Sequence, residues 1–339
     1  MSTFRRYFLL LILSLLVLSS ALVVIRRVPF PGTPGPDFDA RVQRMHTDAI
    51  SDLRPDLVLL GDSIVGENVD DALLSEQIGL QTYPMSFGGS ASALWYLALK
   101  NNILTASHHP KYLVILFRDS TLTAPGYRVQ GKFSAALDEL ATPQDTLVIE
   151  RAYLQTMNPL ELFTEKYFPP YGYRFSFRAR ADANMYALPF AAMRCGKRCV
   201  DAAVLNVFNF QNAAPNRANA SVDLEESLLY SPSALNFDSQ VEQSFLPEIL
   251  RLCKENNITP IFARAKTTRF PSPSAEPPGL RDYLGKLETY LSANGARFVD
   301  LSDDPRVTQE DFIDNFHVFP SARTRYTQML ADALRSVLP

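Results

Sequence analysis

Two short stretches near opposite ends of the chain hold the residue types of nucleophilic catalysis. In the first stretch, Asp56 to Ser63, an apolar run of strand length stops at Gly61 and is followed by Asp62 and Ser63; the second stretch contains Asp314 and His317. A serine hydroxyl becomes a good nucleophile when a neighbouring base takes its proton and a carboxylate orients that base. Asp314 and His317 are three residues apart, and in a turn entering a helix this spacing lets the carboxylate hold one imidazole nitrogen while the other faces a serine. Each motif alone is common and carries little weight.

The elements that must position these residues alternate along the chain. Strands are predicted at 56–60, 81–85, 112–117, 259–264 and 296–301, and helical patterns occupy 69–78, 94–106, 241–255, 280–294 and 321–338. Strands separated by helices form a parallel, doubly wound sheet with helices on both faces. The predicted fold class is therefore a three-layer α/β/α fold. Active sites of such sheets lie beyond the carboxyl ends of the strands, where Ser63 is expected.

Two further predicted strands are followed by loops whose residues could bind a ligand. Ser86 to Ser92 is a loop of small residues that contains Gly88 and Gly89, and glycines let backbone amides approach a ligand closely. Ordinary β-to-α turn chemistry explains the same glycines. Arg118 and Asp119 follow the third strand, and charges that appear abruptly at a carboxyl end are more informative than charges on a helix.

In this order along the chain, the four segments resemble the SGNH or GDSL hydrolase family. The resemblance covers roughly residues 55–120 and 257–339 and leaves the middle of the chain unmatched. It implies a flavodoxin-like α/β/α fold with Ser63 as nucleophile, His317 as general base and acid, and Asp314 as the orienting carboxylate. It implies no cofactor, and the sequence offers no convincing metal-ligand set.

The resemblance also implies an oxyanion hole. Its donors would be the backbone N–H of Ser63, Gly89 and a side chain after the third strand, where the family's asparagine is replaced by Arg118. A guanidinium can donate to an oxyanion, and its charge strengthens the bond. The alternative is that Arg118 pairs with Asp119 and serves only structure. Asp62, Gly88 and Asp119 are the predicted supporting residues.

The N-terminus contains a membrane-span candidate. The run from Tyr7 to Ile25 has no charged residue and is bracketed by arginine pairs at 5–6 and 26–27. About 20 apolar residues span a bilayer as a helix. A cleaved signal peptide is the competing interpretation, with Ser19-Ser20-Ala21 as its cleavage site. An uncleaved signal anchor is favoured, because apolar residues continue beyond that site. The protein is then a single-pass membrane protein whose catalytic domain lies on the extracytoplasmic side.

The remaining boundaries follow from composition. Residues 1–27 form the predicted anchor, 28–50 a proline-rich linker and short helix, and 51–339 the hydrolase-like domain, in which 121–238 is a mostly helical insertion or cap. Cys195 and Cys199, separated by three residues, could close a small disulfide loop in an oxidising compartment.

The overall charge argues against a nucleic-acid partner. The chain has 33 Lys and Arg against 36 Asp and Glu, a net charge of −3, so it offers no strongly basic surface by composition. The leading functional prediction is a serine ester hydrolase acting on O-acylated envelope or exported polysaccharide, since the arrangement resembles the membrane-tethered members of the family. The alternatives are an O-acyltransferase working with envelope acyl-transfer machinery and a non-catalytic glycan-binding protein.

Overall fold

The structure is a computed structural model, and it describes residues 3–25, 27, 29–36, 40–130, 134–172, 227–270 and 273–338. The chain divides into two compact units. The N-terminal unit comprises Met1–Gly35 and Leu154–Glu225, and the sheet unit comprises Pro36–Tyr153 and Glu226–Pro339. The predicted disulfide of Cys195 and Cys199 lies outside the described residues. The division also runs through the segment 121–238 that the sequence suggested as one insertion.

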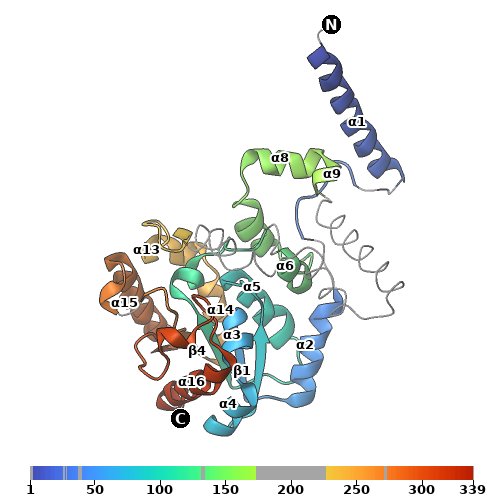
Figure 1. Cartoon of the computed structure of the whole chain (residues 1–339). Helices are drawn as coiled ribbons and strands as arrows, with labels where there is room; N and C mark the ends of the chain where they lie inside the picture. Colours follow the sequence, from blue (N-terminus) through green and yellow to red (C-terminus); the bar gives the residue numbers. More distant parts are fainter. Residues whose placement is uncertain are drawn as a thin grey trace, which may run out of the picture. The chain divides into compact units, whose positions relative to one another are not determined.

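A five-stranded parallel sheet forms the centre of the sheet unit (Figure 1). Its strands are β1 (Leu57–Gly61), β2 (Thr82–Ser86), β3 (Tyr112–Phe117), β4 (Thr259–Arg264) and β5 (Arg297–Asp300). Their spatial order is β2-β1-β3-β4-β5, and every neighbouring pair is parallel. The predicted doubly wound α/β/α class is confirmed. The sequence placed all five strands, two of them with the observed bounds and three within a residue.

Helices cover both faces of this sheet, as the strand order requires. Right-handed crossovers place the helix after β1, which moves outward to β2, on the opposite face from the helices that follow β2, β3 and β4. The first face therefore carries α4 (Asp71–Ile78), against which α16 (Arg323–Val337) packs. The second carries α5 (Ser92–Ala98), extended by a π-helical turn over Leu99–Ile103, then α14 (Leu246–Glu255) and α15 (Pro278–Ala293). Helix α2 (Ala40–Leu53) packs on the π-helical turn.

The core explains why the apolar runs of the sequence are continuous. All five residues of β1 are buried, and so are five of the six residues of β3, because helices cover the sheet on both sides. Large side chains close the helix–sheet layers, among them the fully buried Trp95, Tyr283 and Tyr326. The buried strands β1 and β3 thus run side by side up to Gly61 and Leu116, and Ser63 lies two residues beyond Gly61.

The described residues of the N-terminal unit include three helices. It contains α1 (Thr3–Ile25), α8 (Pro159–Tyr167) and α9 (Pro169–Gly172). Residues Phe4–Ile25 form one helix long and apolar enough to cross a membrane, a property that a signal sequence shares. At about 1.5 Å per residue this helix is about 33 Å long.

Candidate active site

Strand register brings the predicted site segments to one edge of the sheet. Gly61 at the end of β1 lies opposite Ser86 at the end of β2 and opposite Leu116 near the end of β3. The loops that follow these three strands therefore start side by side. They carry Ser63, the Gly88-Gly89 turn and Arg118, which the sequence had placed at this edge.

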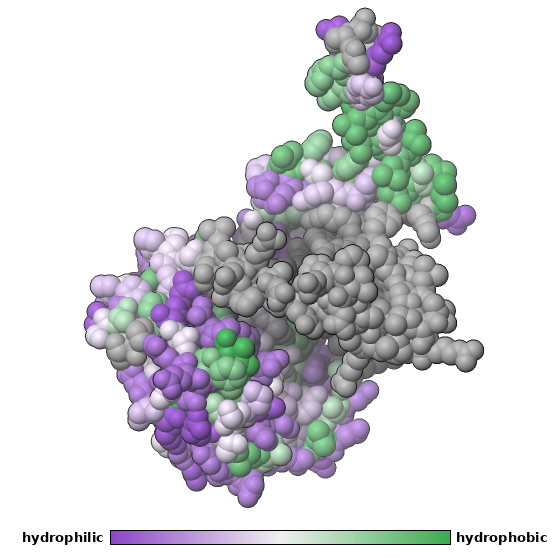
Figure 2. All heavy atoms as spheres, in the orientation of Figure 1, coloured by the Kyte–Doolittle hydropathy of each residue, from purple (hydrophilic) through white to green (hydrophobic). Residues whose placement is uncertain are grey.

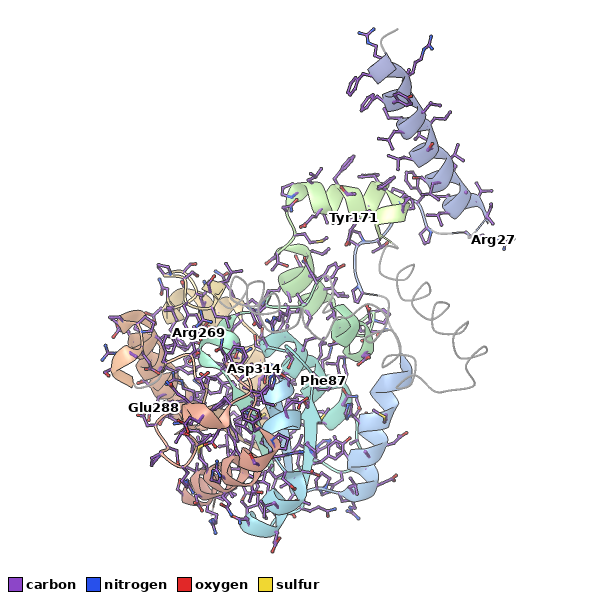
Figure 3. The ribbon with its side chains drawn as sticks, viewed as in Figure 1. Arg27, Phe87, Tyr171, Arg269, Glu288 and Asp314 are labelled. Carbon is purple, nitrogen blue, oxygen red and sulfur yellow. The ribbon has the colours of Figure 1, made fainter. Side chains whose placement is uncertain are left out.

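Ser63, His317 and Asp314 form a continuous hydrogen-bonded chain. Ser63 Oγ lies 2.7 Å from His317 Nε2, and His317 Nδ1 lies 2.8 Å from Asp314 Oδ2. In the tautomer with the proton on Nδ1, the imidazole donates to Asp314 and the hydroxyl of Ser63 donates to Nε2. Asp314 is labelled in Figure 3. This is the geometry in which a histidine can take a proton from a serine.

The loop that carries Asp314 and His317 is shaped by the aspartate itself. Asp314 Oδ1 accepts hydrogen bonds from the backbone N–H of Phe316 at 2.7 Å and of His317 at 2.8 Å. The N–H of Ile313 donates to the carbonyl of His317 at 2.7 Å, which closes the loop. The spacing of three residues therefore works as the sequence suggested: one carboxylate oxygen folds the turn and the other orients the imidazole.

The same contacts set the ionisation of the pair. Partial burial alone would raise the pKa of Asp314, but the hydrogen bonds from His317 and from the two backbone N–H groups outweigh it and lower the pKa to about 2. The hydrogen bond to Asp314 raises the pKa of His317 above its usual 6.5 against the opposing effect of burial, and the charges of Asp62 and Glu67 act in the same direction as Asp314. The site is thus built to hold an ionised carboxylate beside a more basic imidazole.

Asn68 joins the serine helix to the histidine loop, a role that was not predicted. It is the last residue of α3 (Ser63–Asn68) and is fully buried. Its Nδ2 donates to the carbonyl of Phe316 at 2.8 Å, and its Oδ1 accepts from the N–H of Val318 at 3.0 Å. Because Phe316 and Val318 flank His317, this one side chain fixes the backbone on both sides of the imidazole.

The turn that contains Gly88 and Gly89 is tied to the start of the serine loop. Ser90 N–H donates to the carbonyl of Phe87 at 2.9 Å, and Gly89 adopts φ +72°, which favours glycine at that position. Ser90 Oγ accepts from Trp95 Nε1 at 2.8 Å and donates to the carbonyl of Gly61 at 3.1 Å. Ser90 and Trp95 thus hold the turn beside Gly61. This role of the two residues was not predicted from the sequence.

A glycine is required at position 61 because Leu116 and Val65 lie too close to leave room for a side chain. A Cβ on this residue would lie 2.7 Å from the carbonyl oxygen of Leu116 and 2.7 Å from Cγ2 of Val65. Both distances are too short for a real contact. A side chain at this position would therefore push β1 away from β3 or displace α3, and either movement would shift Ser63.

Asp62 and Arg118 form a buried ion pair behind the serine. Asp62 Oδ1 caps α3 by accepting from the N–H of Ile64 at 2.9 Å, and its Oδ2 accepts from Arg118 Nε at 2.9 Å. Arg118 is 3% exposed, and its guanidinium lies 4.2 Å from the centre of the Phe316 ring. Arg118 therefore contacts both the capping residue of the serine helix and the histidine loop. Its role as an oxyanion donor stays a prediction.

Asp119 has a different partner from the one considered in the sequence. It accepts from Arg264 at the end of β4 at 3.0 Å and from the hydroxyl of Tyr230. Arg264 also binds Glu276 and, at 3.1 Å, Asp300. Asp119 thus belongs to a buried charge network at the ends of β3, β4 and β5. The alternative in which Arg118 pairs with Asp119 is wrong, because Arg118 pairs with Asp62.

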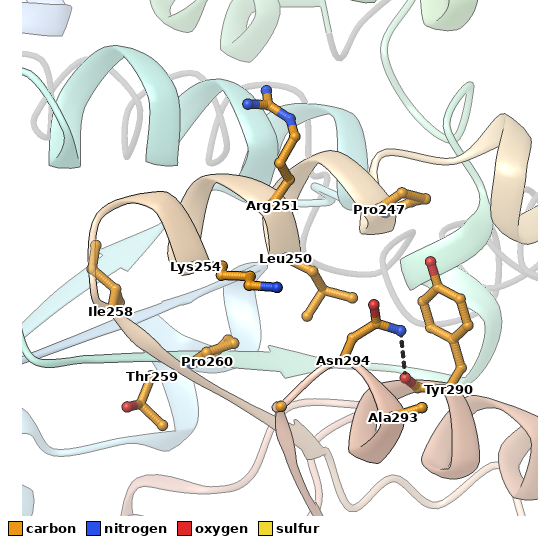
Figure 4. A pocket seen from close by; sticks show the side chains of 11 residues that line it. Pro247, Leu250, Arg251, Lys254, Ile258, Thr259, Pro260, Tyr290, Ala293 and Asn294 are labelled. Atoms are coloured by element: carbon orange, nitrogen blue, oxygen red, sulfur yellow. Dashed lines mark hydrogen bonds between the residues drawn. The ribbon is translucent and has the colours of Figure 1, made fainter.

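Other features of the described residues lie away from this constellation. A cavity of about 570 Å³ opens beside Thr259 and Pro260 at the amino-terminal end of β4, where Arg251, Lys254 and Asn294 also line it (Figure 4). It is therefore at the opposite edge of the sheet from Ser63. Within the described ranges, no group of three or more His, Cys, Asp or Glu side chains could hold a metal ion.

Comparison with known proteins returns matches among solved structures. No protein-family profile matches the chain, and neither does any curated protein. A GDSL-like lipase from Bacteroides thetaiotaomicron is 11% identical, with 88% of this chain and 96% of that chain covered and a TM-score of 0.38. A lipolytic protein of the G-D-S-L family from Desulfitobacterium hafniense is 8% identical, with 82% and 98% covered and a TM-score of 0.37.

A further solved structure is similar to this chain at the same level. A third, described as an acylhydrolase, comes from Bacteroides fragilis and is 12% identical, with 83% and 85% covered and a TM-score of 0.37.

Proposed function

We propose that the protein is a serine ester hydrolase that forms an acyl-enzyme on Ser63. The observation that carries this proposal is the chain of contacts from Ser63 Oγ to His317 Nε2 at 2.7 Å and from His317 Nδ1 to Asp314 at 2.8 Å. The serine and the histidine remain partly exposed to solvent, so a substrate can reach them. A purely structural serine would not need a base that is itself oriented by a carboxylate.

The proposed reaction has two halves. Ser63 Oγ attacks the ester carbonyl carbon while its proton passes to His317 Nε2, and Asp314 stabilises the imidazolium that forms. His317 then returns the proton to the leaving alkoxide, which departs as the alcohol and leaves an acyl ester on Ser63. Water attacks that ester while its proton passes to His317 Nε2. His317 then returns the proton to Ser63 Oγ as the acyl bond breaks, which regenerates Ser63 and releases the carboxylic acid.

The negative oxygen that develops in each half needs hydrogen-bond donors. Ser63 is the first residue of α3, and N–H groups in the first turn of a helix lack intrahelical partners. We propose this N–H and that of Gly89 as donors, with Arg118 as the predicted third. Because Arg118 Nε is bound to Asp62, the observed contacts favour a positioning role for this arginine over direct donation.

The N-terminal helix supports a proposal about location and substrate. If α1 crosses a membrane as an uncleaved anchor with its N-terminus in the cytoplasm, the sheet unit lies on the extracytoplasmic side. We therefore propose O-acylated envelope or exported polysaccharide as the substrate class. A sugar hydroxyl that replaced water in the second half would make the same site an O-acyltransferase, fed by envelope acyl-transfer machinery. The intact contacts at Ser63 disfavour a non-catalytic glycan-binding protein.

The test is turnover of a simple ester by the full-length protein, with and without a sugar acceptor. We expect p-nitrophenyl acetate to be cleaved at a rate that Ser63→Ala abolishes, with acetate as the product. Acetylated sugar appearing at the expense of acetate would establish transfer. Equal turnover by the wild type and Ser63→Ala would refute the nucleophile.

A further inference from the structure

Helix α8 exposes its apolar side chains and buries a polar one. Leu160, Phe163 and Tyr167 follow one another at helical spacing and are 73%, 60% and 43% exposed. Glu165, on another side of the helix, is buried. A helix on the surface of a water-soluble protein shows the reverse pattern. The face made by Leu160, Phe163 and Tyr167, called the α8 apolar face below, therefore needs an occupant other than water.

The helix is nevertheless well formed where it stands. Asn158 caps it by accepting from the N–H of Glu161 at 2.9 Å, and the Glu161 side chain accepts from the N–H of Asn158 at 3.2 Å. At the other end, the N–H of Gly32 donates to the carbonyl of Lys166 at 2.8 Å. The exposure of the apolar face is thus a property of an ordered helix that is bonded to the segment after α1.

The end of α8 faces the apolar helix α1 of the same unit across a cavity, and α9, which follows α8, packs on α1. Tyr167, Phe168 and Phe30 line a cavity of about 490 Å³ whose other wall is α1, from Ile12 to Val24. The rings of Phe30 and Tyr167 meet edge to face at 6.5 Å, and Leu22 of α1 is buried. Figure 2 shows that hydrophobic side chains cover α1 along most of its length. A bilayer that surrounds α1 must therefore come up to Tyr167.

We propose that α8 lies in the headgroup layer of the bilayer that α1 spans, with the α8 apolar face towards the acyl chains. This proposal rests on the membrane span inferred under the proposed function. Aromatic side chains favour that layer because a ring is both apolar and polar at its edge, and Leu160 adds apolar area. Lys166, which is exposed and whose Nζ lies 5.4 Å from the centre of the Tyr167 ring, can reach lipid phosphate.

Depth-dependent fluorescence quenching tests the position of α8 directly. The full-length protein has one tryptophan, Trp95, which is buried in the sheet unit and serves as the baseline. A second tryptophan is introduced by Phe163→Trp. The matched control is Leu228→Trp, because Leu228 is 64% exposed but belongs to the sheet unit. Each variant is reconstituted into phosphatidylcholine vesicles with ordinary or brominated acyl chains.

We expect the emission added by Phe163→Trp to shift to the blue and to be lost in brominated lipid, while that of Leu228→Trp is unchanged. Unquenched emission from Phe163→Trp in protein that resists carbonate washing would overturn the inference and leave the anchor intact. Release of the protein by carbonate would instead overturn the anchor. Blue-shifted but unquenched emission that depends on protein density would assign the α8 apolar face to a second copy of the chain and overturn the lipid assignment.

Discussion

At the scale of single residues, the protonation state of His317 can be tested through the pH dependence of activity. His317 must be neutral to accept a proton from Ser63, and the hydrogen bond to Asp314 raises the pKa of His317 above 6.5. We therefore expect kcat/KM for a simple ester to fall on acidification with a midpoint above pH 6.5. A profile that is flat from pH 5 to 8 would contradict His317 as the base.

The variant Asp314→Asn tests whether Asp314 causes the raised pKa of His317. Removing the carboxylate removes the largest contribution to the raised pKa of His317, so the acidic midpoint should move to lower pH. The turnover should fall by roughly 10²–10⁴, because the imidazole loses its orientation and the stabilisation of its charged form. An unchanged midpoint would show that Asp314 does not set the basicity of His317.

The same pair links folding stability to pH in both directions. The lowered pKa of Asp314 means that its stabilising contribution is present above its usual 3.8 and is lost as the pH falls through about 2. The raised pKa of His317 means that its contribution is complete below 6.5 and is lost as the pH rises through the higher, folded-state value. Thermal unfolding of wild type and His317→Ala at pH 6 and pH 9 should therefore differ most at pH 6.

Asn68 is a residue whose role is seen only in the structure, and its replacement can be tested. Asn68→Ala leaves the carbonyl of Phe316 and the N–H of Val318 without their partner, each at a cost of about 1–3 kcal/mol of unfolding free energy. Because both groups flank His317, we expect kcat to fall at least tenfold with little change in KM. Thr327→Val is the control, since Thr327 is a buried acceptor for the N–H of Asp70, the capping residue of α4. Equal kcat losses in the two variants would reduce Asn68 to a structural role.

Some residues of the candidate site could be predicted from the sequence, and others depend on contacts between distant parts of the chain. Ser63, Asp314 and His317 have reactive groups and stand at strand ends or in a turn, so their types and local setting suggested them. Asn68 is an ordinary residue at the end of a short helix, and its partners are about 250 positions away in the chain. Such a role depends on tertiary contacts that no local pattern contains.

At the scale of elements, the carboxyl ends of β3, β4 and β5 are joined by the buried guanidinium of Arg264. Arg264→Met would leave the carboxylates of Asp119 and Glu276 buried without their cation. We expect the unfolding free energy to fall by about 3–5 kcal/mol. Denaturant unfolding measures it. The control Arg251→Met breaks an exposed pair with Glu255 and should cost less than about 1 kcal/mol. Similar losses in both variants would mean that the network contributes nothing beyond a surface pair.

Strands were easier to place from the sequence than helix ends. β3 coincides with a continuous apolar run, and β4 has an apolar centre from Pro260 to Ala263, because both faces of a central parallel strand are buried. The helix predicted over 94–106 is instead α5 followed by a π-helical turn, Leu99–Ile103. Periodicity predicts that a helical segment exists but not how it is wound. The π-helical turn packs on α2, a tertiary contact that the local pattern does not contain.

At the scale of the whole molecule, the proposed membrane anchor can be tested separately from the active site in the sheet unit. The full-length protein should remain with membranes after a carbonate wash, because Phe4–Ile25 is long and apolar enough to span them. Recovery in the supernatant, or a mature N-terminus near residue 21, would instead identify a cleaved signal peptide. The order of helices and strands was predictable from alternation alone. The division between units was not, since Leu154–Glu225 groups with the distant Met1–Gly35.

Mass spectrometry of a covalent adduct tests Ser63 as the nucleophile most directly. The full-length protein is treated with a fluorophosphonate, digested, and the modified peptide sequenced. We predict a single modified residue, Ser63, and a labelling rate at neutral pH that falls by at least tenfold in His317→Ala. An adduct on another serine, or an equal labelling rate in His317→Ala, would contradict the proposed site.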